Sequence, residues 1–395
     1  MTMRLLFITE NYPPDRGGMG ESCDRIVRGL ASAGVLIDVV HFDRKSAMAS
    51  YRETSGGSIT RVPPEADVPH AMNVLWNRLQ QTLRLGAITH VVAFGGTLPL
   101  LSAPVFAAWM DRPFVTLIRG NELDAGVFDP RRRPILDDAF RRSAAICAVT
   151  RTQAERIRAL HPEVRVQVVP NGIDFELWQL TDADRARGAA WRVQNVEPSR
   201  RVLAFFGHLK NKKGVPFFVE SLVRSGLADR FHLLFVGEMD EVPAVAHSLL
   251  PPVDRFDLLP YYSASDFVVL PSHYDGFPNV LIEAASLAKP LLASEVGGML
   301  DALTDGENAF LFAPGDDSTC RRAIARAAEI DEDALRRMGA AAATLARNRF
   351  DARAETEGYL EVLTHVMPTR SEGPGRVEGT ISAPPAHQVP RYASG

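Results

Sequence analysis

Two carboxylates eight positions apart, Asp275 and Glu283, are the residues whose type and spacing most directly suggest chemistry. Asp275 precedes Pro278, which favours the start of a helix, so Glu283 falls in the early turns of that helix. The free N–H groups of a helix start can bind phosphate oxygens, and a carboxylate beside them can accept both hydrogen bonds of a ribose diol. The loop carboxylate can instead accept from sugar hydroxyls. The alternative interpretation is an ordinary helix whose acidic residues favour its dipole.

A cluster of cations follows a predicted strand in the segment Gly207–Gly214, where Lys210, Lys212 and Lys213 lie close together. Cations at the end of a strand, in a cleft, can neutralise a diphosphate and stabilise it as a leaving group. The segment lacks the GxxxxGK[ST] pattern of a Walker loop. A solvated lysine turn is the alternative interpretation.

A glycine-rich loop, Asn11–Ser22, connects the first predicted strand to the first predicted helix and contains Gly17 and Gly18. Glycines allow the backbone to approach a ligand closely and to present N–H groups at a helix start, which suits phosphate. The loop does not match GxGxxG, so a dinucleotide-binding fingerprint is not supported. A simple glycine turn is the alternative.

The elements that position these residues alternate between short apolar runs and helical patterns, which predicts an α/β fold with doubly wound parallel sheets. A helix is expected at Ser22–Ala33, capped by Ser22 and stopped by Gly34. The expected strands are Arg4–Glu10, Leu36–Phe42, Ile59–Val62, His90–Gly95, Phe114–Arg119, Ala145–Thr150, Val166–Pro170, Val202–Gly207, His232–Gly237, Asp257–Leu259, Phe267–Pro271, Pro290–Ser294 and Ala309–Ala313.

The length of 395 residues exceeds what one core usually supports and therefore predicts two domains. We expect one Rossmann-like domain over residues 1–173, a polar hinge over 174–200, a second such domain over 201–351 and a disordered tail over 367–395. Open α/β sheets bind ligands at the carboxyl ends of their strands. The three motifs all fall at turns between a strand and a helix, where a cleft between two such domains would lie.

Composition excludes several classes of function. A net charge of −4 does not favour nucleic-acid binding. Three scattered cysteines form no CxxC pair, so neither a disulfide framework nor a zinc site is indicated, and a cytoplasmic protein is expected. The uncharged stretch Leu85–Met110 is long enough to span a bilayer. Gly95, Gly96, Pro99 and Pro104 interrupt it, however, and a buried strand followed by a buried helix is the preferred interpretation.

The segment Asp275–Glu283 resembles the E-x7-E signature of family 4, the retaining glycosyltransferases of the GT-B fold, whose two Rossmann-like domains face a cleft. The resemblance covers residues 4–366 and is most specific in the C-terminal half. Further segments match the family in the correct order: Gly17–Gly18, Val169–Asp174, Gly207–Gly214, Leu259–Asp266, Val269–Ser272, Ala288–Pro290, Ala293–Gly298 and Asp305–Asn308.

The resemblance implies roles by position. Lys213 and His208 would hold the donor diphosphate, Asp275 would meet the transferred sugar, and Glu283 would bind the ribose. The family also implies that the N-terminal domain receives the acceptor and that a last helix, at about 352–366, returns to it. The donor-binding residues so implied are Gly17, Gly18, His208, Lys213, Leu259, Asp275, Gly276, Phe277, Pro278, Asn279, Val280, Leu281 and Glu283.

Three positions depart from the family pattern. His208 stands where arginine is usual, which makes that cation dependent on pH. Asp275 replaces the first glutamate of the signature, and Arg119 occupies the place of a histidine that faces the sugar. We expect Arg119 to contact phosphate or acceptor, and Asn121 or Glu122 to line the acceptor side. The catalytic candidates are Lys213, Asp275, Arg119 and Asn121.

The resemblance therefore implies a retaining glycosyltransferase that uses a nucleoside-diphosphate sugar, with UDP the first choice of nucleotide and GDP the second. The acceptor is expected to be a glycan, a lipid-linked sugar or a small molecule, and no metal or other cofactor is expected. The basic stretches Arg131–Arg133 and Arg141–Arg142 are interpreted first as solvated helix ends, and the alternatives are a contact with anionic lipid at the membrane or with a phosphorylated acceptor. The alternative functions are a sugar-nucleotide epimerase of the same fold and a non-catalytic nucleotide-sugar-binding protein.

Overall fold

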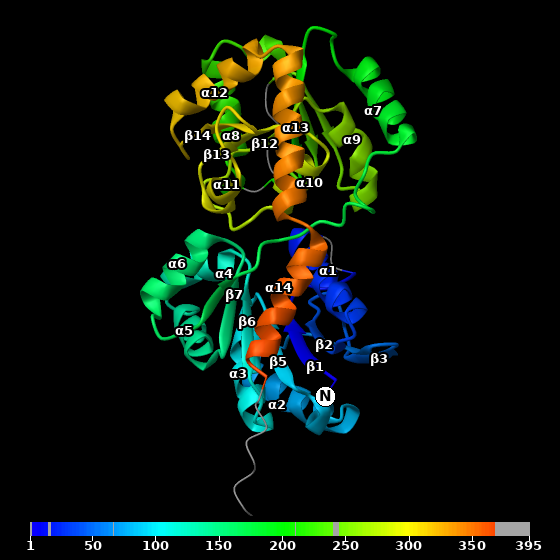
Figure 1. Cartoon of the computed structure of the whole chain (residues 1–395), viewed down its shortest axis with the longest axis vertical. Helices are drawn as coiled ribbons and strands as arrows, with labels where there is room; N and C mark the ends of the chain where they lie inside the picture. Colours follow the sequence, from blue (N-terminus) through cyan, green and yellow to red (C-terminus); the bar gives the residue numbers. More distant parts are fainter. Residues whose placement is uncertain (1, 15–16, 66, 210, 240–244, 368–395) are drawn as a thin grey trace, which may run out of the picture.

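The computed structural model describes residues 2–14, 17–65, 67–209, 211–239 and 245–367. They form two α/β domains stacked along the long axis of the molecule, with the N-terminal domain below the C-terminal domain in Figure 1. Asp15 and Arg16 of the glycine loop and Lys210 of the cation segment lie outside the described residues, as do residues 368–395 of the expected tail.

The N-terminal domain is built on an eight-stranded sheet in the order β3-β4-β2-β1-β5-β6-β7-β8, which is parallel except for the β3–β4 pair. Strands β5 and β6 are buried along their whole length, because helices cover both faces of the sheet. The strands are β1 (Arg4–Thr9), β2 (Leu36–Phe42), β3 (Ser50–Thr54), β4 (Gly57–Val62), β5 (His90–Phe94), β6 (Phe114–Ile118), β7 (Ala145–Ala148) and β8 (Val166–Val168). The helices are α1 (Gly18–Ser32), α2 (Val68–Thr82), α3 (Thr97–Met110), α4 (Asn121–Asp124), α5 (Arg133–Arg142) and α6 (Arg151–Leu160), with short 3-10 turns at η1 (Leu85–Ala87) and η2 (Gly126–Phe128).

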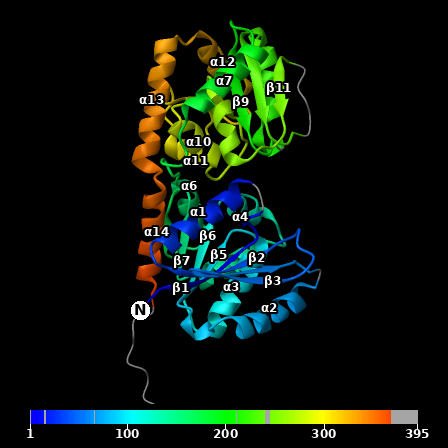
Figure 2. The same cartoon turned by 90° about the vertical axis from the view of Figure 1, so that its right-hand side faces the viewer.

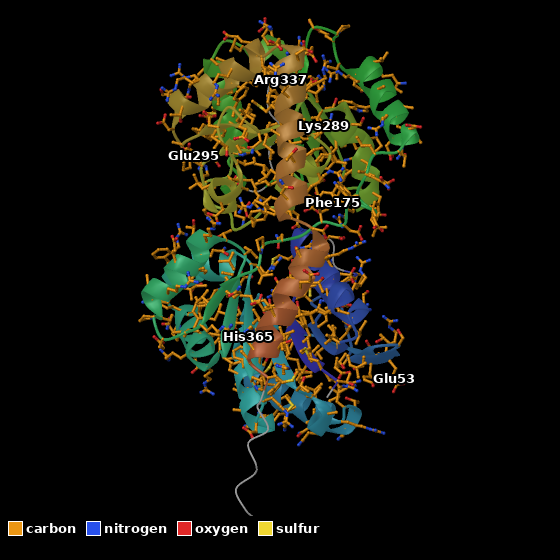
Figure 3. The ribbon with its side chains drawn as sticks, viewed as in Figure 1. Glu53, Phe175, Lys289, Glu295, Arg337 and His365 are labelled. Atoms are coloured by element: carbon orange, nitrogen blue, oxygen red, sulfur yellow. The ribbon has the colours of Figure 1, made fainter. Side chains whose placement is uncertain are left out.

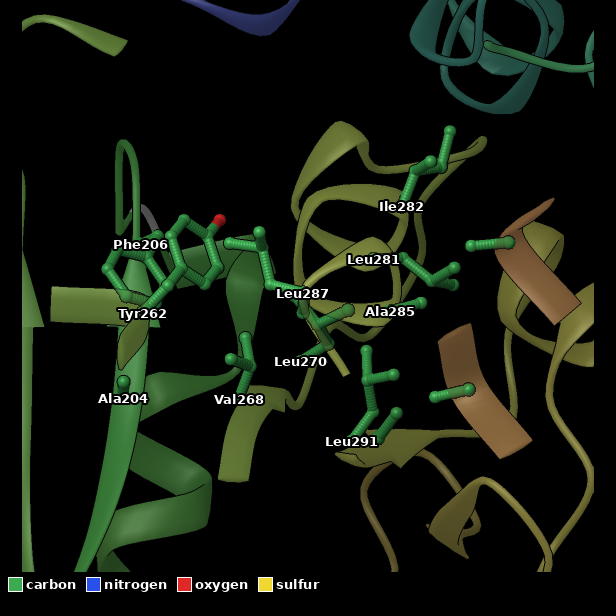
Figure 4. Packing of buried hydrophobic residues seen from close by; sticks show 14 of the residues in the cluster. Ala204, Phe206, Tyr262, Val268, Leu270, Leu281, Ile282, Ala285, Leu287 and Leu291 are labelled. Carbon is green, nitrogen blue, oxygen red and sulfur yellow. The ribbon is translucent and has the colours of Figure 1, made fainter. Parts of the chain in front are cut away.

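The C-terminal domain is built on a parallel six-stranded sheet in the order β11-β10-β9-β12-β13-β14. Apolar side chains from the sheet and from α10 pack into one continuous core, part of which is drawn in Figure 4. The strands are β9 (Arg201–Phe206), β10 (Phe231–Val236), β11 (His247–Leu250), β12 (Phe267–Leu270), β13 (Leu291–Ser294) and β14 (Ala309–Phe312). The helices are α7 (Asp182–Asn195), α8 (Val215–Arg224), α9 (Leu259–Ala264), α10 (Asn279–Ser286), α11 (Gly297–Ala302), α12 (Asp317–Glu329) and α13 (Glu332–Arg349), with 3-10 turns at η3 (Asn211–Lys213), η4 (Ala228–Arg230) and η5 (Arg255–Leu258).

The last helix, α14 (Ala352–His365), returns to the N-terminal domain. Figures 1 and 2 both show α13 beside the upper domain and α14 beside the lower one. Helix α14 packs on α1, where Arg25 Nε donates to Glu355 Oε2 at 2.6 Å in a buried ion pair. The chain thus crosses between the domains twice, and α14 fixes the second crossing.

Four details differ from the sequence-based expectations. Helix α1 begins at Gly18, so Ser22 lies inside the helix and is not its cap. The stretch 174–200, expected as a hinge, contains α7, which packs closely enough on α9 that Gly188 has no room for a side chain beside Pro260. The predicted strand Asp257–Leu259 is helical, because Pro260 favours a helix start. Strands β3 and β11 were not expected, since their half-exposed sequences lack an apolar run.

None of the helices in the described ranges has both the length and the apolar character needed to cross a bilayer. The stretch Leu85–Met110 divides into a 3-10 turn, strand β5 and helix α3, as expected from its glycines and prolines. The three cysteines are buried, free thiols.

Candidate active site

A first cavity of about 270 Å³ lies between the domains at the carboxyl ends of β9 and β10. Parallel α/β sheets bind ligands at this position, because the turns that follow the strands converge there. The N-terminal domain contributes the start of α1. The lining residues are Gly17, Gly18, Glu21, Phe206, Gly207, His208, Val236, Gly237, Glu238, Pro252, Val253, Asp254, Arg255, Leu258, Asn279, Val280 and Glu283.

Glu283 places its carboxylate in this cavity while remaining 7% exposed. Tyr262 donates its hydroxyl hydrogen to Glu283 Oε2 at 3.0 Å, and Arg255 Nε lies 3.4 Å from Oε1. Tyr262 is fully buried and stacks on Phe206 (Figure 4), so it holds the carboxylate rigidly. Burial, with a further contribution from Glu283, raises the pKa of Tyr262 well above its usual value, and the phenol remains a donor. Arg255 is held in turn over the ring of Trp178 at 4.9 Å.

Helix α10 presents its first turn to the same cavity. Leu281, Ile282 and Ala285 are buried and anchor the helix in the core (Figure 4), whereas Asn279 and Val280 line the cavity. Backbone N–H groups at a helix start favour an anion. The start of the helix, where an anion is favoured, thus lies one turn from the Glu283 carboxylate.

The glycine loop of the N-terminal domain closes the cavity from the other side. Asn279 Nδ2 donates to the backbone oxygen of Gly18 at 2.9 Å and to Ser22 Oγ at 3.1 Å. A Cβ at Gly18 would lie 3.5 Å from Asn279 Nδ2, which is an ordinary contact distance, so this approach does not require glycine at position 18. The two domains meet directly at the predicted phosphate-binding elements.

Asp275 and Lys213 form an ion pair that lies outside the lining of the first cavity. Their side chains are 14% and 28% exposed, respectively. Asp275 instead lines a second cavity of about 750 Å³, which also lies between the domains. His208 lines the first cavity, where its Nδ1 is 3.4 Å from Glu238 Oε2.

Arg119 occupies a different environment from the expected one. Its side chain is buried, with the guanidinium donating to the Tyr359 hydroxyl of α14 at 2.8 Å and to Asn171 Oδ1. The guanidinium also lies over the ring of Phe94. It lines neither interdomain cavity. Two of its five N–H donors bind these buried partners, so in this structure Arg119 joins distant segments of the chain. Its contact with phosphate or acceptor stays a prediction.

Asn171 extends this contact across the domain boundary. Its Nδ2 donates to the backbone oxygen of Phe277 at 2.9 Å and to Asn279 Oδ1 at 3.1 Å. Arg119, Asn171, Asn279 and Gly18 therefore form a continuous hydrogen-bonded chain, which we call the interdomain chain.

The other acceptor-side candidates are also placed by the structure. Glu122 accepts from the backbone N–H groups of Gly120 at 2.9 Å, Arg119 at 3.3 Å and Gly96 at 3.4 Å, so its carboxylate shapes the loop after β6. The backbone of Asn121 begins α4, but its side chain lies outside the described part of the chain. Glu122 lines neither of the two interdomain cavities.

Several predicted donor-binding residues lie in the core next to the first cavity and do not line it. Leu259, Phe277 and Leu281 are buried in the core, and Leu258 lines the cavity in place of Leu259 because η5 turns its side chain outwards. Pro278 is the residue before α10. Gly276 passes so close to Gly120 of the other domain that a side chain there would clash with the Arg119 carbonyl oxygen.

Sequence reasoning missed the residues that reach the site from distant segments. Arg255 and Glu21 line the first cavity beside Glu283, and Asn171 joins the domains. Asn171 lies in the Val169–Asp174 segment that resembles the family, which was the one signal available. Glu21 lies in the glycine-rich loop Asn11–Ser22 but was not singled out there, and Arg255 had no motif around it.

Two family descriptions match successive parts of the chain. Residues 16–177 match Glycosyltransferase Family 4, and residues 200–329 match Glycosyl transferases group 1. The D-inositol 3-phosphate glycosyltransferase of Actinosynnema mirum is 31% identical over 229 residues, which represent 52% of this chain and 54% of that protein. The chain thus spans about half the length of this curated relative. Glycogen synthase of Mycobacterium tuberculosis is 26% identical over 408 residues, covering 91% of this chain and 94% of that protein.

Solved structures share the whole architecture. Sucrose-phosphate synthase from Thermosynechococcus elongatus matches with a TM-score of 0.72 at 17% identity, over 92% of this chain and 99% of that one. HepE of Anabaena in complex with UDP-glucose matches with a TM-score of 0.72 at 18% identity, over 92% of this chain and 100% of that one. At these identities the likeness concerns the fold, and it confirms the GT-B architecture predicted from the sequence.

Proposed function

Because this chain belongs to the group 1 glycosyl transferases of glycosyltransferase family 4, we propose that it transfers a sugar from a nucleoside diphosphate to a hydroxyl group of an acceptor. The first cavity is the observation that carries the proposal. There the rigid Glu283 carboxylate, the start of α10 and the Gly17–Gly18 loop of the opposite domain come together. A ribose diol on the carboxylate and a diphosphate at the helix start fit this arrangement.

UDP is the nucleotide we favour, with GDP as the second choice. The support is the shared fold of HepE, whose structure contains UDP-glucose. The base would lie near Leu258 and Pro252–Arg255, which line the far end of the first cavity. The names of the relatives include a phosphorylated cyclitol and a polysaccharide, so they leave the class of acceptor open.

We propose that transfer retains the configuration of the anomeric carbon. The bond from this carbon to the diphosphate oxygen breaks as the acceptor oxygen bonds on the same face, and the acceptor proton passes to the leaving phosphate. Lys213 and the start of α10 stabilise the charge on the leaving diphosphate, which makes a metal unnecessary for this step. The Lys213–Asp275 pair keeps this cation next to the carboxylate proposed to meet the sugar.

Peripheral membrane contact remains a prediction with little support. Arg132 and Arg133 of the basic stretch lie 3.4 Å and 3.6 Å from Asp129 and Asp137, respectively. These local ion pairs offset the positive charge that anionic lipid would need.

The first test combines binding and turnover. Thermal unfolding of the full chain is measured with UDP, GDP and ADP, and sugar release from the matching nucleotide sugars is measured with EDTA present. A ligand at a hundred times its dissociation constant adds about 2.7 kcal/mol to the free energy of unfolding. We expect one diphosphate to stabilise the chain and its sugar to be consumed despite EDTA. No stabilisation by any diphosphate would refute the proposal, and activity that needs added Mg²⁺ would refute its metal independence.

Two alternatives are separated by the products. A non-catalytic binder would be stabilised by the diphosphate and would consume no nucleotide sugar. An epimerase would convert its substrate without a second substrate, whereas a transferase forms a new glycoside only when an acceptor is present.

A further inference from the structure

The second cavity lies beside the point where the transferred sugar would be held. The N-terminal domain contributes α4, η2 and α6, and the C-terminal domain contributes the turns after β12 and β13. Asp275 lines this cavity, and the proposed function brings the donor sugar to Asp275. A hydroxylated molecule in the second cavity would therefore reach the anomeric carbon without passing through the nucleotide site.

Large apolar side chains are exposed around this cavity. Phe128 is 85% exposed, Leu300 is 53% exposed and Tyr274 is 43% exposed, and they come from both domains. Exposed aromatic rings that converge on one hollow are typical of a binding site, because a ring offers a large rigid contact area at a low cost in conformational entropy. The apolar face of a sugar or cyclitol ring is a ligand that such side chains can cover.

Half of the polar residues that line the cavity are carboxylates, namely Asp124, Asp129, Asp275 and Glu295; the others are Thr152, Arg156, His273 and Tyr274. Figure 3 shows Glu295 at the side of the C-terminal domain that carries α11. Carboxylates accept hydrogen bonds from hydroxyl groups, and several of them around one ring suit a polyol.

Three of the cations near these carboxylates form ion pairs with them. Arg156 Nη1 donates to Asp124 Oδ1 at 3.0 Å, and Arg132 Nε lies 3.4 Å from Asp129 Oδ2. Lys213 pairs with Asp275. Burial raises the pKa of the Asp124 carboxyl. The positive charge of Arg156 lowers this pKa, whereas the negative charges of Glu122 and Asp275 raise it further. A phosphate group would have to compete with these carboxylates for the same cations and would face their negative charge.

Resting on the proposed transferase function, we propose that the second cavity binds the acceptor and that it selects a neutral, polyhydroxylated ring over a phosphorylated one. Phe128 provides the platform for the ring, and Asp129 and Glu295 accept from its hydroxyl groups. The hydroxyl group that is glycosylated points towards Asp275.

The test uses the full chain and the nucleotide sugar identified above, with release of the nucleoside diphosphate as the readout. The probes are matched pairs: methyl glucoside against glucose 6-phosphate, and myo-inositol against myo-inositol 1-phosphate. We expect the neutral member of at least one pair to stimulate release at a lower concentration than its phosphorylated partner. In Phe128→Ala the half-saturating concentration of that probe should rise roughly tenfold, with the diphosphate still binding as before. Met48→Ala, which removes another highly exposed apolar side chain outside the cavity, should leave it unchanged.

A charge reversal provides the complementary readout. Glu295→Lys changes an exposed residue at the rim of the cavity and should shift the preference towards the phosphorylated probe by about fivefold. Wild-type preference for the phosphorylated probes, no effect of Phe128→Ala, or no stimulation by any of the four probes would overturn this proposal. In each case the diphosphate would still bind and the proposed function would stand. Failure of every nucleoside diphosphate to bind would instead overturn the proposed function and this proposal together.

Discussion

Glu283→Gln is the substitution that most directly tests the first cavity. The carboxylate is almost completely buried, accepts from the Tyr262 hydroxyl and lies beside Arg255. Glutamine preserves the size of the side chain and one acceptor oxygen for Tyr262. It removes the negative charge and replaces the other oxygen with an NH₂ donor, which cannot accept from a ribose hydroxyl.

The expected effect on binding follows from the hydrogen bond that is lost. A hydrogen bond to a charged group contributes about 1.5–3 kcal/mol, so the nucleoside diphosphate should bind roughly tenfold to a hundredfold more weakly. Without ligand the cost should be smaller, about 1 kcal/mol, because Tyr262 keeps an acceptor and only the ion pair with Arg255 is lost. The two effects can be measured separately.

Isothermal titration calorimetry with the diphosphate gives the dissociation constant, and urea unfolding gives the stability without ligand. Glu295→Gln is the matched control, since it makes the same chemical change in the second cavity and should leave diphosphate binding unchanged. A dissociation constant for Glu283→Gln within about threefold of the wild type, in a protein that urea unfolding shows to be folded, would refute the assignment of Glu283 as the ribose acceptor.

Three further predictions concern the surroundings of the site. Gly276→Ala should lower turnover by roughly tenfold to a hundredfold, because its methyl group would push against the Arg119 carbonyl across the domain boundary. Gly86→Ala is the control, because that position faces open space, and its turnover should not change. Equal turnover in both variants would contradict the argument. Arg119→Lys should lower the free energy of unfolding in urea by about 2 kcal/mol, since the single nitrogen of lysine cannot occupy the two positions from which Nη1 donates to Tyr359 and Nη2 to Asn171. Unchanged stability would show that these buried contacts contribute little. Burial lowers the pKa of Lys289 from 10.5 to about 8. Between pH 8 and 10.5 this residue therefore binds fewer protons in the folded than in the unfolded chain, so the free energy of unfolding rises with pH. The cost of burying the charged lysine is lost as the pH rises through that window. Relative to Lys289→Met, the wild type should gain about 3 kcal/mol of stability across that range, and a constant difference between the two urea curves would contradict the shift.

The elements of the fold that could be predicted are those whose signal is local. Strands such as β5 and β6 are continuous apolar runs, because both faces of the sheet are covered. Helix α10 follows from Pro278 and the apolar residues after it, so the Asp275–Glu283 spacing could be placed on a loop and a helix. By contrast, β11 is short and half-exposed, and its position at the sheet edge comes from pairing with β10, which its own residues do not encode.

The part of the site that could not be predicted depends on contacts between distant segments. Arg119 was expected to contact phosphate or acceptor because it occupies the position where the family it resembles carries a histidine that faces the sugar. Its guanidinium is instead buried by Tyr359, which lies 240 positions later on α14. No local pattern records that α14 returns to this point. The same limit applies to Arg255, which reaches Glu283 only because η5 and α10 pack together.

The contacts that join the domains are also the contacts that shape the donor site. Asn279 belongs to the lining of the first cavity, and its amide binds Gly18 of the opposite domain and Asn171 in the connecting segment. A diphosphate held between the start of α10 and the glycine loop would bind both domains at this same place. Donor binding and domain approach would therefore reinforce each other, because each orients groups that the other needs. The second cavity is lined by both domains as well, so the same approach that secures the donor would complete the surface on which the acceptor is proposed to lie.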